Sequence, residues 1–284
     1  MFTLKIKNDK GDIYELTHNY TRYYVTSIEG LTPPAVTVNT SSAGLIDGEF
    51  YNSSRMRPRN IVITVVLEGN IEANRQKLYS IFPLKKEIEI YYANKNRDVK
   101  IKGYVESIEG DIFVQREQMQ ISIICPRSYF EGTAAIQSDI SRVVPLFEFP
   151  FNIEQPVPIS ELRSNPISRI ENVGDVECGC IVTAKFKSVM TDFKITNLST
   201  KQYLKVSDYA FLGGDILTIC SIQGSLSISL VRGTETINLL PYVDNGSSWL
   251  EITSGLNIFT YSVTGGSIDK VEVNIEFTPL YGGV

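Results

Sequence analysis

The sequence predicts a mainly β protein, and three observations carry that prediction. The 284 residues include 33 Ile but only 8 Ala, together with 15 Tyr and 13 Phe. β-Branched and aromatic residues favour strands, whereas Ala favours helices. Short apolar runs alternate with polar residues, and Gly, Asn and Asp stand between the runs. With 43% apolar and 21% charged residues, the chain is expected to fold rather than remain disordered.

The first thirty residues predict a hairpin followed by a short strand. Phe2, Leu4 and Ile6 alternate on one face before the turn at residues 8–11. A second strand at residues 23–28 ends at Gly30 and the two prolines that follow, because proline cannot donate to a strand ladder.

Residues 39–60 are predicted as a long polar connection. Long connections within a compact domain are usually functional or are ordered by a partner. This one carries Arg55, Arg57 and Arg59. Two interpretations stay open: a solvated loop, and an arm ordered against a neighbouring subunit.

Residues 71–81 predict the one clear helix. Asn70 caps it, Pro83 closes it, and Ile71, Leu78 and Phe82 share its apolar face. That narrow face fits packing on the chain's own sheet. The polar face is a candidate contact with a neighbouring subunit and contains Arg75, Gln76 and Lys77. Strands are expected before the helix at residues 61–67 and after it at residues 87–92, 99–108 and 118–124.

A proline-rich segment divides the chain. Five of the twelve prolines fall between Pro145 and Pro166. Such segments are stiff and tend to mark domain boundaries. We therefore expect a first domain at residues 1–132, a linker at 133–168 and a second domain at 169–284. The aromatic residues Phe147, Phe149 and Phe151 are expected to pack on one of the domains.

The second half predicts a β-sandwich. Short strands recur about every ten residues with glycine-containing turns between them. The expected strands are residues 180–186, 193–197, 202–206, 216–220, 227–231, 249–252, 257–262 and 270–278.

Charge and cysteine usage exclude several classes. The net charge of −5, without a basic block, argues against sequence-specific nucleic-acid binding. Neither a signal peptide nor a bilayer-spanning helix is expected from the short apolar runs. The four cysteines lack zinc-like spacing and are expected to be reduced thiols.

No catalytic constellation is found, so we predict no enzyme, cofactor or metal. The only histidine, His18, sits at the end of a predicted hairpin, and there is no phosphate-binding glycine loop. A glycosidase needs two converging carboxylates, which the sequence alone leaves open.

Saccharide binding is the more serious alternative. Trp249 lies near Asp244 and Asn245, which gives one candidate contact set of an aromatic platform with polar partners. The competing interpretation is that Trp249 fills the core of the sandwich, because large aromatic residues mainly bury area.

Collinear motifs over nearly the whole chain resemble the distal tail proteins of long-tailed, siphovirus-type phages. Each motif is weak alone, and their shared order makes the resemblance fairly specific. In the first half they are residues 59–63, the helix with Arg75 and Leu78, Phe82-Pro83, residues 101–106 and residues 125–130. In the second half they are residues 149–151, 170–175, 214–215, 248–250, 255–257 and 281–284. Arg127-Ser128 departs from the Asp-Pro frequent in that family.

The resemblance implies a tail-tube-like β-barrel or sandwich with one flanking helix, followed by a galectin-like or carbohydrate-module-like β-sandwich. It implies a homo-hexameric ring at the virion tail tip, made in the bacterial cytoplasm, that joins the tail-tube protein to the tail-tip hub. Receptor-binding or baseplate proteins are further implied partners. The alternative function is a module that binds cell-wall carbohydrate during host adsorption. DNA would be only transient cargo, and an acidic channel would repel its phosphates.

Overall fold

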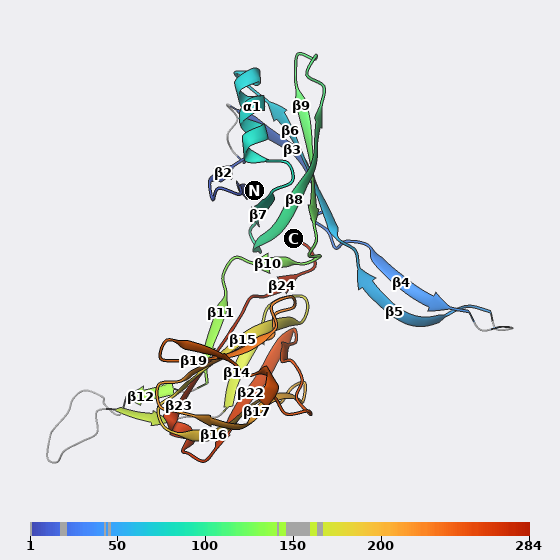
Figure 1. Cartoon of the computed structure of the whole chain (residues 1–284). Coiled ribbons are helices and arrows are strands. Elements are labelled where there is room, and N and C mark those ends of the chain that lie inside the picture. The colour runs from blue at the N-terminus through green and yellow to red at the C-terminus, as the bar shows by residue number, and fades with distance from the viewer. Residues whose placement is uncertain are drawn as a thin grey trace. The chain divides into compact units, whose positions relative to one another are not determined.

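The chain divides into two compact units, described one at a time (Figure 1). The computed structural model describes residues 2–17, 22–42, 44, 47–140, 142–145, 160–163 and 167–284. The first unit is Met1–Thr133 with Leu280–Val284, and the second is Ala134–Pro279. His18 and the aromatic residues Phe147, Phe149 and Phe151 lie outside the described residues.

A nine-stranded sheet forms the first unit. Its order is β2-β1-β7-β8-β9-β6-β3, every pairing is antiparallel, and β10 joins both β8 and β24. The strands are β1 (Thr3–Lys7), β2 (Ile13–Glu15), β3 (Tyr23–Glu29), β6 (Arg59–Leu67), β7 (Glu87–Ala93), β8 (Asp98–Gly110), β9 (Gln118–Cys125), β10 (Phe130–Gly132) and β24 (Leu280–Tyr281).

One face of this sheet is apolar and buried. Ile61, Ile63 and Val65 on β6 lie beside Ile121 and Ile123 on β9, and all five are fully buried. Full burial of such a side chain contributes about 1.5–3 kcal/mol. The alternation that predicts these strands is therefore confirmed, since intervening residues face the other side.

The predicted helix is confirmed as α1 (Ile71–Ile81). The Asn70 side chain accepts a hydrogen bond from the backbone N–H of Ala73 at 3.2 Å, as an N-cap does. Leu78, Ile81 and the following Phe82 are buried in the same core as the sheet. Figure 1 shows α1 against the sheet.

Arg59 is buried inside the first unit. Its guanidinium donates to the carbonyl oxygens of Ser128 (2.9 Å), Thr32 (2.7 Å) and Gly282 (2.6 Å), and also to that of Gly30. It lies 4.3 Å from the ring centroid of Phe130. Burial lowers the pKa of Arg59, yet a guanidinium stays protonated in proteins. The expectation that Arg59 faces a neighbouring subunit is therefore wrong, because its side chain is 1% exposed.

Glycine is required where the chain passes Arg59. Gly30 has a φ of +82°, and a Cβ there would lie 2.0 Å from the carbonyl oxygen of Asn60. No other residue fits that contact without moving the backbone. The Gly30 carbonyl is thereby held where the Arg59 guanidinium reaches it.

The last residues of the chain complete the first unit. β24 pairs antiparallel with β10, the Val284 N–H donates to the Leu31 carbonyl at 3.1 Å, and Arg97 bonds the Gly283 carbonyl. Arg97 also lies 4.8 Å from the ring centroid of Tyr281. The second unit is therefore inserted between two paired strands of the first.

Two sheets form the second unit, as a sandwich requires. The larger has the order β11-β23-β15-β18-β19-β20, with β21 on β15, and the smaller has the order β14-β22-β16-β17. Phe186 on β15 contacts Phe193 on β16 and Phe211 on β17, so the sheets pack face to face. The strands are β11 (Ile136–Asp139), β14 (Ile167–Asn172), β15 (Cys178–Phe186), β16 (Met190–Asn197), β17 (Gln202–Phe211), β18 (Ile216–Cys220), β19 (Ser227–Arg232), β20 (Glu235–Asn238), β21 (Glu251–Ile252), β22 (Gly255–Thr264) and β23 (Val271–Phe277).

Two short hairpins stand apart from these sheets. They are β4 (Val36–Ser41) with β5 (Phe50–Met56), and β12 (Arg142–Pro145) with β13 (Ser160–Arg163). The second hairpin lies within the predicted linker. Two 3₁₀ turns, η1 (Leu240–Tyr242) and η2 (Ile268–Lys270), complete the described elements. The mainly β class is confirmed, with α1 as the one α-helix in the described ranges.

Removing the Arg59 guanidinium is expected to destabilise the first unit strongly. Arg59→Met leaves four carbonyl oxygens without this donor, and we expect a loss of about 3 kcal/mol in the free energy of unfolding. Urea unfolding measures it. Arg57→Met is the matched control, because Arg57 is exposed two residues away and should cost less than about 0.5 kcal/mol. Equal losses in the two variants would contradict this role for Arg59.

Three of the four thiols are expected to be unreactive in the folded chain. Burial raises the pKa of Cys125 and Cys178 to about 12 and that of Cys180 to about 11, whereas Cys220 is only half-buried. At pH 8 a thiol with a pKa of 12 is ionised in about one molecule in ten thousand, and the thiolate is the nucleophile. Ellman's reagent should therefore find one fast thiol in native protein and four after denaturation. Cys220→Ser should remove the fast phase, and Cys125→Ser should keep it.

Candidate functional site: exposed surfaces of the two units

The β4–β5 hairpin is an arm whose side chains are almost all exposed. The segment predicted as a polar connection forms this hairpin, so the loop prediction is wrong. Within the described residues the two strands pair only with each other, and Figure 1 shows them projecting from the sheet of the first unit. An isolated two-stranded hairpin is marginally stable in water. Among the described residues, the arm therefore has no strand partner outside its own hairpin.

The register of the arm separates an apolar face from a polar one. Val36 lies opposite Met56, and Val38 lies opposite Ser54, so the two valines and Met56 share one face. Arg55 lies opposite Thr37 on the other face. Val38 is 55% exposed, and Phe50 and Tyr51, farther along the arm, are 56% and 66% exposed. The Val-Thr-Val alternation at residues 36–38 was the sequence signal for this surface.

The arginine candidates divide between arm and core. Arg55 and Arg57 are exposed, and the Arg57 guanidinium donates to the Thr37 hydroxyl at 3.0 Å. Arg59 lies in the core and belongs to no surface. A subunit contact for Arg55 and Arg57 stays a prediction.

The polar face of α1 is largely occupied by contacts within the first unit. Arg75 forms two hydrogen bonds to the Glu117 carboxylate, at 2.8 and 2.9 Å, and also bonds Glu72. The Gln76 amide donates to Glu72, and Lys77 lies 4.6 Å from the ring centroid of Tyr14. Gln76 and Lys77 keep exposed surface, so a subunit contact there also stays a prediction.

The turn between β8 and β9 exposes three successive apolar residues that the sequence reasoning missed. Ile112 is 43% exposed, Phe113 93% and Val114 44%. The Asp111 carboxylate accepts the backbone N–H of Phe113 at 2.9 Å and so orders the turn. We call residues 112–114 the apolar tip.

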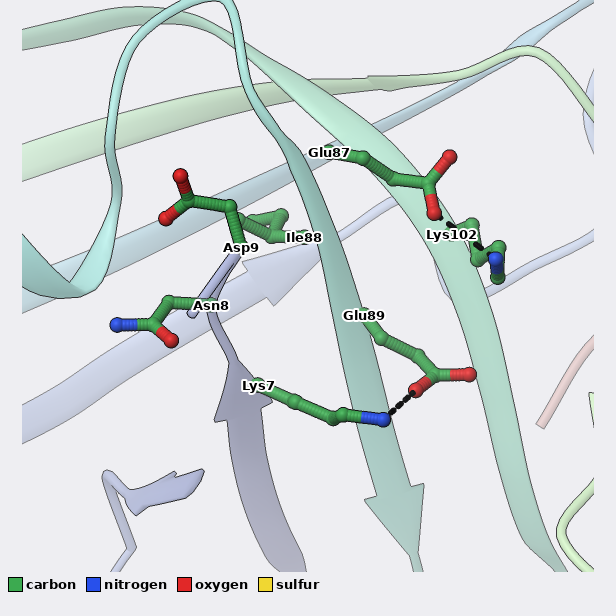
Figure 2. Close-up of a pocket in the computed structure, with 7 residues that line it drawn as sticks. All are labelled: Lys7, Asn8, Asp9, Glu87, Ile88, Glu89 and Lys102. Carbon is green, nitrogen blue, oxygen red and sulfur yellow. Dashed lines mark hydrogen bonds and ion pairs between the residues drawn. The ribbon is translucent and has the colours of Figure 1, made fainter. Parts of the chain in front are cut away.

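Charged side chains line a pocket on the exposed face of the first sheet. Figure 2 shows Lys7 bonded to Glu89 and Lys102 bonded to Glu87, at 3.3 and 2.8 Å. The pocket has a volume of about 240 Å³ and is lined by Lys7, Asn8, Asp9, Glu87, Ile88, Glu89 and Lys102. The carboxylates of Glu87 and Glu89 each have a lysine partner.

The ionisation of these groups follows from their contacts. The hydrogen bond between Lys102 and Glu87 lowers the pKa of the Glu87 carboxyl and raises the pKa of the Lys102 amine. Burial acts against ionisation of Glu89, but hydrogen bonds and charge from Tyr91, Lys100 and Lys7 outweigh it and lower its pKa. Burial and the bond to Glu89 raise the pKa of Tyr91 to about 12. At neutral pH both glutamates are therefore negative and Tyr91 is neutral.

The three candidate saccharide contacts differ in their exposure to solvent. Trp249 is half-buried, and the fully buried residue is its neighbour Leu250. The strand predicted at residues 249–252 begins only at Glu251. Asp244 is half-buried, and its backbone carbonyl accepts a hydrogen bond from the Ser247 N–H in a turn. Asn245 is exposed. Saccharide binding by Trp249, Asp244 and Asn245 stays a prediction.

The described ranges contain no group of three or more His, Cys, Asp or Glu side chains able to hold a metal ion. Nor do those ranges include a helix with the length and apolarity needed to cross a bilayer.

Comparison with known proteins gives two family matches and several structural ones. Residues 9–125 match a phage tail protein RIFT-related domain, and residues 173–281 match the C-terminal domain of a siphovirus-type tail component. The sequence matches none of the curated proteins with which it was compared.

Solved phage proteins share the fold at low identity. The crystal structure of SPP1 Dit (gp 19.1), described as a paradigm of the hub adsorption apparatus in phages infecting Gram-positive bacteria, aligns over 99% of both chains. Its TM-score is 0.69 at 13% identity. A chain of the phage P2 baseplate in its activated conformation with Ca aligns over 97% of this chain and 98% of its own. Its TM-score is 0.50 at 13% identity.

The two family models match in the expected order, one in each unit, and the SPP1 Dit fold extends across both. The resemblance found in the sequence is thereby confirmed. The chain belongs to the siphovirus-type distal tail protein family, and its two units carry the domains of phage tail proteins.

Proposed function

We propose that six copies of the chain form a closed ring that joins the tail tube to the tail-tip hub. The observation that carries this proposal is the arm, an amphipathic hairpin with no packing partner among the described residues of its own chain. A head-to-tail contact between identical subunits closes into a ring when its rotation closes. The two faces of such a ring differ from each other, as a connector between different proteins requires.

The arm is proposed as the contact between neighbouring subunits. Burial of an exposed Val or Met side chain contributes about 1.5–3 kcal/mol, so the apolar face of the arm supplies a driving force only when a neighbour covers it. Arg55 and Arg57 add charge beside this face and restrict which surface it fits. The occupant is a second copy of this chain, since each copy presents the same uncovered surface.

The apolar tip is proposed as a contact along the ring axis. β10 pairs with β8 at Val99 and Lys100, near its beginning, whereas the tip follows the other end of the thirteen-residue strand. The tip therefore lies at the opposite end of β8 from β10, the strand after which the chain enters the second unit. We propose that it contacts the adjacent protein of the tail. Receptor-binding or baseplate proteins would attach elsewhere on the ring.

Charge on the apolar face of the arm is expected to prevent ring formation without unfolding the subunit. The double variant V36D/V38D places two carboxylates on the apolar face, where a neighbour must pack, while exposed positions cost the monomer about 0.5 kcal/mol or less. Light scattering over a range of concentrations should give six times 31.8 kDa for the wild type and 31.8 kDa for the variant.

The matched control changes two exposed apolar residues of the second unit. Val189 and Leu226 are 58% and 50% exposed, so V189D/L226D adds the same charge away from the arm. It should assemble like the wild type. A V36D/V38D variant that still forms the full ring would refute the proposed role of the arm.

A further inference from the structure

The turn at residues 244–247 contains the one Asn-Gly pair of the sequence. The backbone carbonyl of Asp244 accepts the Ser247 N–H at 2.9 Å, so Asn245 and Gly246 occupy the two central positions of a β-turn. Both central residues are exposed. Asparagine followed by glycine is a chemically labile pair, because no side chain hinders the glycine nitrogen when it attacks the asparagine amide carbon.

The two reacting groups of this pair are both free of hydrogen bonds. The Asn245 side-chain amide and the Gly246 N–H have no hydrogen-bond partner among the described residues. Other asparagine side chains are held in place. The amide of Asn172, for example, donates to the carbonyl oxygens of Val176 and Ile252, each at 3.1 Å. A held amide gives up such bonds before it reacts, whereas Asn245 gives up none.

Asn96 provides a comparison within the same chain. It is exposed too, and its side-chain amide likewise bonds no residue in the described ranges. The residue that follows it, Arg97, carries a side chain, and its backbone N–H donates to the Asn94 side-chain oxygen at 2.9 Å. The nitrogen after Asn96 is therefore occupied, while the nitrogen after Asn245 is available for reaction.

The turn also covers the outer edge of β17, the last strand of the smaller sheet. The Tyr203 carbonyl accepts the Ser248 N–H at 2.8 Å. Lys205 bonds the turn twice, because its carbonyl accepts the Asp244 N–H at 2.9 Å and its N–H donates to the Ser247 hydroxyl at 3.0 Å. These three hydrogen bonds depend on the length of the backbone between residues 244 and 248.

We propose that Asn245 is a deamidation site in the folded protein, and that the isoaspartate formed there releases the turn from β17. Hydroxide removes the proton of the Gly246 nitrogen, which bonds to the Asn245 amide carbon. The bond from that carbon to the amide nitrogen breaks, ammonia leaves with a proton taken back from water, and a cyclic succinimide remains. Water then opens the ring, so that the net change is one water consumed and one ammonia released.

The two products of ring opening differ in their effect on the turn. Opening at the side-chain carbon gives aspartate, and opening at the backbone carbon gives isoaspartate. Both add one negative charge. Isoaspartate also routes the main chain through the side chain, which lengthens the backbone by one carbon. The hydrogen bonds to β17 then lose their spacing, and the strand regains an unpaired edge of the kind that folded proteins normally cover.

The test is peptide mass mapping of the folded wild-type protein after incubation at pH 6 and at pH 9. The peptide that contains Asn245 should gain the mass difference between amide and acid, and isoaspartate methyltransferase should label the same peptide. Conversion should be faster at pH 9, because the first step needs hydroxide. It should be at least about fivefold faster at Asn245 than at Asn96, since the Gly246 nitrogen carries neither a side chain nor a hydrogen bond.

Two variants separate the reaction from its consequence. N245Q keeps an amide in the turn, but the ring it would form needs one more atom and closes far more slowly, so it should stay unmodified. Freshly prepared N245D carries the charge of the product on a backbone of normal length. Hydrogen exchange at the Lys205, Asp244 and Ser248 amides should quicken about two- to tenfold in incubated wild type, the protection that one hydrogen bond supplies. It should stay unchanged in both variants.

An intact Asn245 in folded protein at pH 9, or equal conversion at Asn245 and Asn96, overturns the inference. Conversion that begins only after unfolding in urea contradicts reaction in the native turn. Isoaspartate at position 245 with unchanged amide exchange overturns the release from β17. None of these results depends on the oligomeric state, so this inference and the proposed ring succeed or fail separately.

Discussion

One buried guanidinium holds the first unit together. Arg59 bonds carbonyl oxygens from the loop after β3, from the loop before β10 and from the C-terminal residues. These segments are distant in sequence, and Leu31, Phe130 and Tyr281 from them pack together with the core of the first unit. A buried cation is costly unless every donor is bonded, so the site tolerates only one arrangement of the chain around it. The positions of β10 and β24, the two strands between which the second unit is inserted in the chain, depend on that arrangement.

The two faces of the first sheet serve different purposes because the alternation of each strand separates them. The buried face provides stability through aliphatic packing against α1, while the exposed face carries charged side chains such as Lys102 and Glu87. The arm and the apolar tip lie outside this buried face, and Val38, Phe50 and Phe113 are exposed there. In the proposed ring, stability and assembly are carried by separate residues, so surface contacts are able to change without disturbing the core.

The sequence predicted the elements whose signals are local. The Asn70 cap and the apolar positions of residues 71–82 were sufficient for the helix, and alternation was sufficient for the central strands. The arm was taken for a loop because Thr, Asn and Ser occupy much of it and no face is buried. The burial of Arg59 depends on carbonyls up to 223 residues away, and the pairing of Lys102 with Glu87 depends on strand register. Neither is visible until the strands are paired. Trp249 is half-buried while its neighbour Leu250 enters the core, a difference that the sequence does not show.

The pairing of β24 with β10 also has a consequence for synthesis of the chain. The first unit includes β1, yet its strand β24 and the acceptor carbonyl of Gly282 follow the whole second unit in the chain. Domains usually fold in order from the N-terminus during translation. Here the first unit acquires its last strand only after the inserted unit has been made. A nascent chain that stops within the second unit therefore lacks the strand that closes the first.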